Sequence, residues 1–189
     1  MIFLTVGTIF PFDRLVKAVD EAIEANIITV PVFAQIGRAD YKPRNMEFVP
    51  TLDKPQFDKK VDEATFVISH AGIGSLLIAL ERNKRLLVVP RMKEHKEVVN
   101  DHQLATARHF AELGYVLAAY DCKELPQKLR EIESFVPTVR QSQANRVALR
   151  LSQFIDQVAA IADRSSAATC GHKHPVPAGT KSLNGSSTR

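Results

Sequence analysis

Two short, uninterrupted apolar runs constrain this sequence more than any other feature: TFVIS (65–69) and RLLVVP (85–90). A strand that is apolar at every position is typical of a sheet covered on both faces, as parallel sheets are. The segment between the runs predicts a helix, because its apolar residues recur at helical spacing, at Ile73, Leu76, Leu77 and Leu80. A strand–helix–strand pattern of this kind predicts a parallel α/β sheet.

The same alternation extends along most of the chain. Further strand-like runs are IFLTV (2–6), VPVFAQIG (30–37), MEFVP (46–50) and YVLAAY (115–120). Asp13 is predicted to cap a helix after the first run, and Asn100 or Asp101 to cap a helix that Gly114 ends. A last helix, with an apolar stripe, is predicted from about 137 to 163. The predicted fold class is therefore α/β, a Rossmann-like doubly wound parallel sheet.

The net charge of the chain is confined to its last segment. All of the formal charge of +4 lies beyond residue 163, where there are no acidic residues, at Arg164, Lys173, Lys181 and Arg189. Ser, Gly, Pro and Thr are abundant there, which predicts a disordered basic tail at 164–189. Residues 1–163 are predicted to form one domain without net charge, so nothing in it indicates nucleic-acid binding.

The sequence indicates a cytoplasmic protein without a metal site. Its two cysteines, Cys122 and Cys170, are too few for a disulfide framework. No apolar stretch approaches the roughly 20 residues that span a bilayer, and the first residues lack the features of a signal peptide. Cys170, His172 and His174 are possible metal ligands, but no second cluster completes a site, so we expect a plain linker there.

A glycine-rich hexapeptide, HAGIGS (70–75), joins the run at 65–69 to its helix. Ligands of open α/β sheets bind at the carboxyl ends of strands. Glycines let backbone N–H groups approach an anion, the helix N-terminus adds a positive dipole end, and Ser75 adds a hydroxyl. The motif predicts a phosphate or diphosphate site; the alternative is that Gly72 and Gly74 only permit close strand–helix packing. It matches neither the P-loop nor the G-x-G-x-x-G pattern, which argues against a nucleotide kinase or a dehydrogenase.

A second polar cluster, Asn100–Gln103, follows the run at 85–90 after a loop of about ten residues. Helix capping explains Asn100 or Asp101, and solvated surface residues are the alternative for the whole cluster. Capping does not require His102 or Gln103. Because both clusters follow strands of one parallel sheet, we expect them at one edge, where together they would hold a phosphorylated, polyhydroxylated ligand.

In this order, the motifs resemble the C-terminal domain of family-28 glycosyltransferases. The matching segments, between residues 2 and 120, are TVGT, FAQIG, FVPTL, ATFVISHAGIGS, LLVVPR and NDHQLATARHFAELGY. The resemblance is closest to small soluble subunits of two-part glycosyltransferases. These are subunits of bacterial exopolysaccharide glucuronosyltransferases and the eukaryotic catalytic subunit that adds N-acetylglucosamine to dolichol-linked chitobiose. The resemblance implies the single C-terminal, donor-binding half of a GT-B fold.

The resemblance implies a UDP-sugar site on the first cluster. Gly72, Gly74 and Ser75, with the backbone at Ile73, would hold the diphosphate. His70 would lie beside the phosphates and is the one candidate catalytic group. No metal ion or cofactor is implied, because backbone amides and a helix dipole can stabilise the leaving diphosphate.

The sugar and the base of the donor would meet other segments. His102 and Gln103 would bind hydroxyls of the sugar, with Asn100 and Asp101 in support, and the backbone at 48–52 would meet the uracil.

This chain departs from the pattern of many relatives at Asn83-Lys84-Arg85, where they often have Gly-Lys-Pro, and at a position in the preceding predicted helix. Ile78 stands where they carry a glutamate that can bind the ribose, and Glu81, one helical turn later, is a possible substitute. Arg91 is a possible partner of a uronate carboxylate, although an exposed arginine needs no ligand.

A single half of a GT-B enzyme implies a partner. Gly7 and Thr8 would face the cleft between donor and acceptor halves. The resemblance implies the donor-binding catalytic subunit of a two-component, inverting glycosyltransferase. It would transfer a hexosyl group, glucuronosyl among the candidates, to a lipid-linked saccharide in exopolysaccharide or other glycan biosynthesis. The partner would be a membrane-anchored, acceptor-binding subunit that recruits this cytoplasmic chain to the membrane. Two alternatives stay open: a non-catalytic sugar-nucleotide-binding regulatory subunit, and a GT-B-like epimerase, which would need its second domain in the same chain.

Overall fold

The computed structural model describes residues 1–139 and residue 152. Residues 1–139 belong to one compact unit, Met1–Gln141. The helix predicted at 137–163 lies outside the described residues, apart from residues 137–139, which are not helical, and residue 152. The predicted domain boundary at 163 and the tail 164–189 also lie outside them and stay predictions. Within the described part of the chain, no helix has the length and apolar character needed to cross a membrane.

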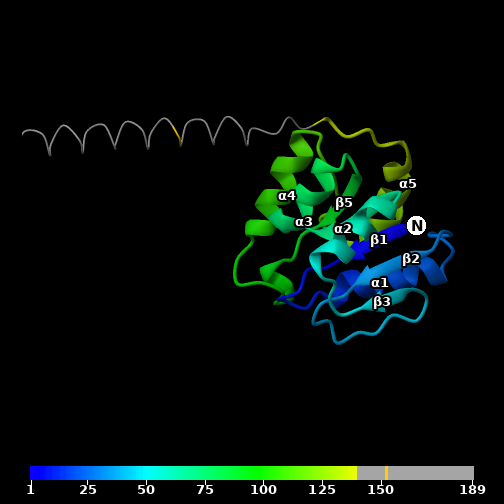
Figure 1. The fold of residues 1–189 in the computed structure, drawn as a ribbon. Helices are drawn as coiled ribbons and strands as arrows, with labels where there is room; N and C mark the ends of the chain where they lie inside the picture. The colour runs from blue at the N-terminus through cyan, green and yellow to red at the C-terminus, as the bar shows by residue number, and fades with distance from the viewer. Residues whose placement is uncertain (140–151, 153–189) are drawn as a thin grey trace, which may run out of the picture. The chain divides into compact units, whose positions relative to one another are not determined.

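Six parallel strands form one sheet in the order β3-β2-β1-β4-β5-β6 (Figure 1). The strands are β1 (Ile2–Thr5), β2 (Val32–Gln35), β3 (Glu47–Val49), β4 (Phe66–His70), β5 (Arg85–Val89) and β6 (Leu117–Ala118). All five neighbouring pairs are parallel. The strand order reverses direction between β1 and β4, as in the doubly wound nucleotide-binding sheet. The predicted fold class is therefore confirmed.

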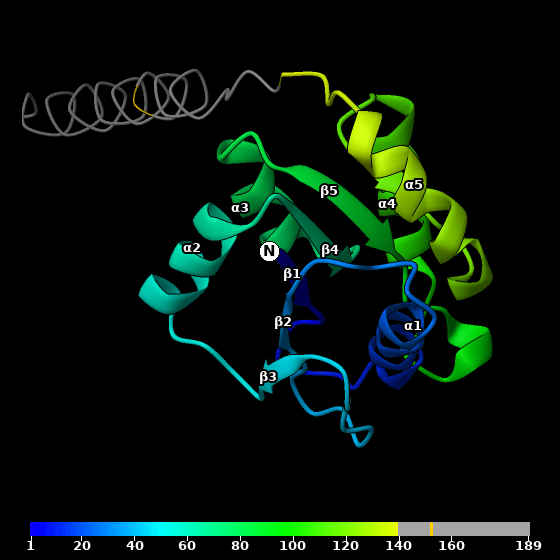
Figure 2. The ribbon, with the colours of Figure 1, turned by 90° about the vertical axis from the view of Figure 1, so that its right-hand side faces the viewer.

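Helices cover both faces of this sheet. They are α1 (Asp13–Glu24), α2 (Lys54–Glu63), α3 (Ile73–Glu81), α4 (His102–Glu112) and α5 (Leu125–Ser134). Figure 2 shows α2 and α3 on one side of the strands and α1 and α5 on the other. The buried side chains form two clusters accordingly, one including those of α1 and α5 and the other those of α2, α3 and α4. The central strands β1, β4 and β5 are almost entirely buried because helices pack against both faces of the sheet.

Two helices, α2 and α5, were not predicted from the sequence. At the start of α2, the Asp53 carboxylate accepts a hydrogen bond from the backbone N–H of Gln56 at 2.8 Å, and the Gln56 side chain accepts from the backbone N–H of Asp53. This reciprocal capping starts a helix that buries only Val61. In α5 the buried residues recur at helical spacing, at Leu125, Leu129 and Ile132. Both signals were present in the sequence, but neither helix has a long apolar face.

The predicted helix caps were partly wrong. Asp13 is the first residue of α1, its carboxylate accepts from the backbone N–H of Tyr41, and no side chain caps the helix. Asp101 occupies the N-cap position of α4 without capping it, and its carboxylate accepts from the backbone N–H of Lys93 at 2.8 Å. Gly114 follows the end of α4 with φ of +70°, as predicted for a helix stop. The two carboxylates therefore hold loops in place.

Candidate functional site

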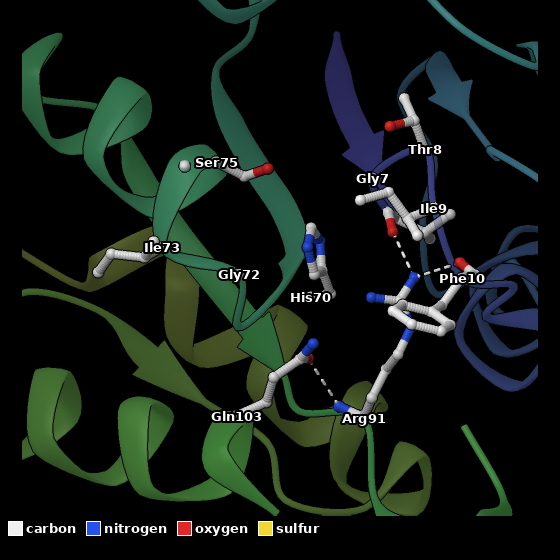
Figure 3. A pocket seen from close by; sticks show the side chains of 12 residues that line it. Gly7, Thr8, Ile9, Phe10, His70, Gly72, Ile73, Ser75, Arg91 and Gln103 are labelled. Atoms are coloured by element: carbon white, nitrogen blue, oxygen red, sulfur yellow. Dashed lines mark hydrogen bonds between the residues drawn. The ribbon is translucent and has the colours of Figure 1, made fainter. Parts of the chain in front are cut away.

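A cleft of about 260 Å³ opens at the carboxyl edge of the sheet, where the strand order reverses (Figure 3). Its walls come from the loop after β1, the β4–α3 turn, the second residue after β5 and the start of α4. The predicted site residues that line it are Gly7, Thr8, His70, Gly72, Ile73, Gly74, Ser75 and Gln103. The fold thus gathers segments that lie nearly 100 residues apart in the sequence. This edge is where open α/β sheets bind ligands.

The N-terminus of α3 faces this cleft without a side-chain cap. Gly72 is the N-cap residue, and no side chain accepts a hydrogen bond from the first turn. The first regular helical bond runs from the backbone N–H of Leu76 to the Gly72 carbonyl, at 3.1 Å. The N–H groups of the residues between them have no partner in the helix and carry its positive dipole end. This arrangement suits an anion.

His70 lies between two glycines at the base of the cleft. A Cβ at Gly72 would overlap the imidazole Nε2, and a Cβ at Gly7 would lie 3.0 Å from its Cε1. Burial, with the nearby charge of Arg91, lowers the pKa of His70 to about 4, so the ring is neutral at pH 7. Its Nδ1 lies 3.4 Å from the Ser69 hydroxyl. Packing alone therefore accounts for Gly72, which makes room for this ring.

Packing does not account for Gly74. Apart from its two chain neighbours and the nearby backbone of its own helix, nothing among the described residues lies within 4 Å of the position its Cβ would take. A glycine inside a helix costs about 0.5–1 kcal/mol relative to alanine, so its presence in the first turn of α3 needs another reason. Gly74 is one of the residues that line the cleft. Close packing therefore explains Gly72. For Gly74, the remaining explanation is that it keeps the backbone accessible to an anion.

Gln103 is buried and projects into the cleft from the start of α4. Its Oε1 accepts a hydrogen bond from the backbone N–H of Arg91 at 3.1 Å. Because this bond fixes the amide orientation, Nε2 is the group presented to the cleft, toward His70 (Figure 3). The site therefore offers a donor at a fixed place, suited to a hydroxyl or carbonyl oxygen.

The other predicted members of the second cluster do not line the cleft. His102 is exposed, and its ring and its backbone N–H both contact the Asn100 side-chain oxygen. The Asp101 carboxylate binds the backbone of Lys93. These three residues fix the loop that precedes Gln103.

The backbone at 48–52, predicted to meet a uracil, also lies outside the walls of the cleft. The backbone N–H of Leu52 donates to the buried side chain of Gln35 at 3.0 Å. Glu81, the possible substitute for a ribose-binding glutamate, ends α3, about 12 Å of helix away from the cleft end. Its position argues against that substitution.

Arg91 differs from the expectation of an exposed residue. It is 3% exposed and lines the cleft, and its guanidinium donates to the backbone carbonyls of Val6, Phe10 and Pro11. The sequence analysis also missed Val6, Ile9 and Phe10 as walls of the cleft. In the sequence, the position of Arg91 just after a buried strand was the one feature that indicated a place at the cleft.

Comparisons with known proteins agree with this geometry. The family model described as glycosyltransferase family 28 C-terminal domain matches residues 1–160. The chain is 34% identical over 128 residues to the UDP-N-acetylglucosamine transferase subunit ALG13 of Homo sapiens, a match covering 61% of this chain and 10% of that protein. The subunit of the same name from Candida albicans is 32% identical over 87 residues, covering 46% and 28% respectively. The chain thus spans well under a third of the length of these relatives.

Solved structures show the same fold. A crystal structure of MurG from Acinetobacter baumannii has a TM-score of 0.54 and 21% identity, covering 80% of this chain and 49% of that one. The solution structure of ALG13 has a TM-score of 0.52 and 24% identity, covering 79% and 93% respectively. Sequence match, strand order and the cleft at the reversal of the sheet lead to one assignment. The chain belongs to the family of glycosyltransferase family 28 C-terminal domains.

Proposed function

We propose that this chain is the donor-binding catalytic subunit of a two-component, inverting glycosyltransferase that uses a UDP-sugar. The observation that carries the proposal is Gly74, a glycine that nothing in the described protein requires, in the uncapped first turn of a helix that opens on the cleft. A diphosphate needs such a surface, because its oxygens must come within hydrogen-bond distance of backbone N–H groups.

The diphosphate would lie on the first turn of α3. The N–H groups of Ile73, Gly74 and Ser75 and the hydroxyl of Ser75 supply donors, and neutral His70 supplies one more at the cleft base. Donors fixed before the reaction stabilise charge that develops on a leaving group at no further cost of reorganisation. In this proposal the transfer needs neither a metal ion nor a cofactor.

The sugar would be held by Gln103. Its Nε2 is oriented by the bond from Oε1 to the Arg91 backbone, so a sugar oxygen meets a preset donor. We assign an indirect role to Asn100, Asp101 and His102. Their hydrogen bonds fix the loop that precedes Gln103. Gly7 and Thr8 form the opposite wall, where an acceptor would enter.

The acceptor would come from a second, membrane-anchored subunit carrying a lipid-linked saccharide. Two observations support a partner at this edge. The matched relatives bear the word subunit in their names, and three apolar side chains around the cleft are exposed: Ile9 at 69%, Phe10 at 49% and Ile73 at 54%. In this proposal the chain is cytoplasmic and reaches the membrane only through that partner.

The donor sugar has two candidates. The names of the relatives include N-acetylglucosamine, and the resemblance to exopolysaccharide enzymes favours glucuronic acid. The guanidinium of Arg91 is already engaged with three carbonyls, which weakens the case for a uronate contact there. The proposal therefore names the transferred group as a hexosyl group from either donor.

The test has a binding arm and a transfer arm. Calorimetry of the purified chain should show binding of UDP, UDP-N-acetylglucosamine or UDP-glucuronic acid, with CDP and ADP as matched controls for the diphosphate alone. The purified chain should transfer nothing, because the acceptor must be held in line with the anomeric carbon. Transfer should appear after co-expression with a membrane-anchored partner subunit. Binding without transfer in the reconstituted pair would favour a regulatory subunit. Equal binding of UDP, CDP and ADP would refute uridine recognition.

A further inference from the structure

Arg91 is a buried cation whose hydrogen bonds leave one nitrogen free for the cleft. Its Nη2 donates to the carbonyls of Val6 and Phe10, and its Nε donates to the Pro11 carbonyl at 3.2 Å. The Phe12 ring lies under the guanidinium, 4.9 Å from its centre. Nη1 takes part in no hydrogen bond among the described residues, and it points toward His70 in the cleft (Figure 3). The free donor and the phosphate-facing turn of α3 therefore share one cavity.

No carboxylate neutralises this charge within residues 1–139. The acid whose charge acts on Arg91, Glu97, is already paired with Arg14 at 2.9 Å and accepts from the backbone N–H of Met92. Burial lowers the pKa of Arg91 to about 10, so the guanidinium stays charged at pH 7. A buried charge without a counter-charge is costly, and an anion that enters the cleft would relieve that cost.

We propose that Arg91 is a catalytic residue that binds the β-phosphate of the donor through Nη1 and neutralises the charge that develops there. This inference rests on the proposed UDP-sugar donor. In the transfer, the acceptor oxygen bonds to the anomeric carbon while the bond from that carbon to the β-phosphate oxygen breaks. The electron pair of the broken bond stays on the phosphate, and the proton of the acceptor hydroxyl passes to water. The guanidinium supplies the positive charge at the place where the electron pair arrives.

The same side chain links the phosphate to the opposite wall of the cleft. Three of its donors are bound to the loop between β1 and α1, so a phosphate on Nη1 would be connected to the loop that carries Gly7 and Thr8. The Arg91 backbone N–H also orients Gln103. One residue thus joins the proposed phosphate, sugar and acceptor positions.

Arg91→Met tests the charge, with Arg85→Met as the matched control. Arg85 begins the same strand that Arg91 follows, and its guanidinium also donates to backbone carbonyls, those of Ile132 and Glu133, away from the cleft. Calorimetry should show UDP affinity falling about 10- to 100-fold in Arg91→Met, uridine affinity changing less than about twofold, and neither changing in Arg85→Met. Arg91→Lys, which keeps the charge, should recover part of the UDP affinity.

A purely structural role for Arg91 would lower UDP and uridine affinity in parallel, and that result would overturn the proposal. If Arg91→Met does not fold, the wild-type chain provides the test through its arginine side-chain NMR signals. The Arg91 Nε signal should shift on addition of UDP or inorganic pyrophosphate and not of uridine, and the absence of a shift with both anions would overturn the proposal. A response to pyrophosphate without any binding of UDP would refute the proposed donor while retaining the anion site at Arg91.

Discussion

Replacing Gly74 by alanine should make the protein more stable and a poorer binder of UDP. The structure leaves the position of the new Cβ free of any contact within 4 Å, so no clash opposes the change. Alanine in place of glycine inside a helix gains about 0.5–1 kcal/mol, which corresponds to a melting temperature higher by about 2–5 °C. The glycine is thus kept at a cost to stability.

The loss of binding follows from the same geometry. The added methyl group would lie in the uncapped first turn of α3, which lines the cleft, and we expect it to hinder the approach of phosphate oxygens to the N–H groups there. Losing one hydrogen bond to a charged group costs about 1.5–3 kcal/mol, which lowers UDP affinity about 10- to 100-fold. Calorimetry with UDP and a thermal melt of the same sample measure the two effects together.

A matched control is Gln127→Ala, an exposed position near the start of α5 on the other side of the sheet. It should leave UDP affinity unchanged. A more stable Gly74→Ala protein with undiminished UDP affinity would contradict the assignment of this turn to the diphosphate. A lower melting temperature would show that Gly74 has a packing role that the described contacts do not contain.

Three further predictions concern the groups around that turn. Gly72→Ala should destabilise the protein by about 1–3 kcal/mol in denaturant titrations, because its Cβ would overlap the His70 ring; unchanged stability would contradict this packing. The folded-state pKa of His70, about 4, is below the unfolded value of about 6.5, so the unfolded chain binds more protons between these values. Its contribution to stability should be complete above pH 6.5 and fall by up to about 3 kcal/mol toward pH 4, a loss that unfolding curves of His70→Gln should lack. Gln103→Ala should lower turnover of the reconstituted enzyme about 10-fold or more while UDP affinity changes less than about twofold, and equal losses in both assays would exclude a sugar contact.

The local pattern was sufficient for most of the sheet and for the glycine-rich turn at 70–75. The buried strands β4 and β5 were predicted because a strand covered on both faces must be apolar at nearly every position. Helix α2 escaped prediction because it buries a single side chain and carries mostly polar ones. The helical spacing of apolar residues reflects only the surface that a helix buries, so a helix with a small buried surface has a weak pattern.

The candidate site was predicted less evenly than the fold. Residues 70–75 form the strand–helix turn itself, and their place at the cleft follows from that turn, so a local motif located them. Of the four residues at 100–103, only Gln103 lines the cleft, because successive side chains at a helix start point in different directions. Adjacency in sequence therefore could not say which of the four would enter the cleft.

By itself the sequence determined the strands along the chain, the parallel α/β class and the place of the glycine-rich turn, because these depend on the period of apolar residues and on local backbone freedom. Only the tertiary structure decided that Gly72 makes room for His70 while Gly74 faces open space. It alone decided that Arg91 is a buried cation bound to a loop some 80 residues earlier in the chain. Burial, charge balance and the space around a missing Cβ are properties of segments brought together from a distance, and no local pattern contains them.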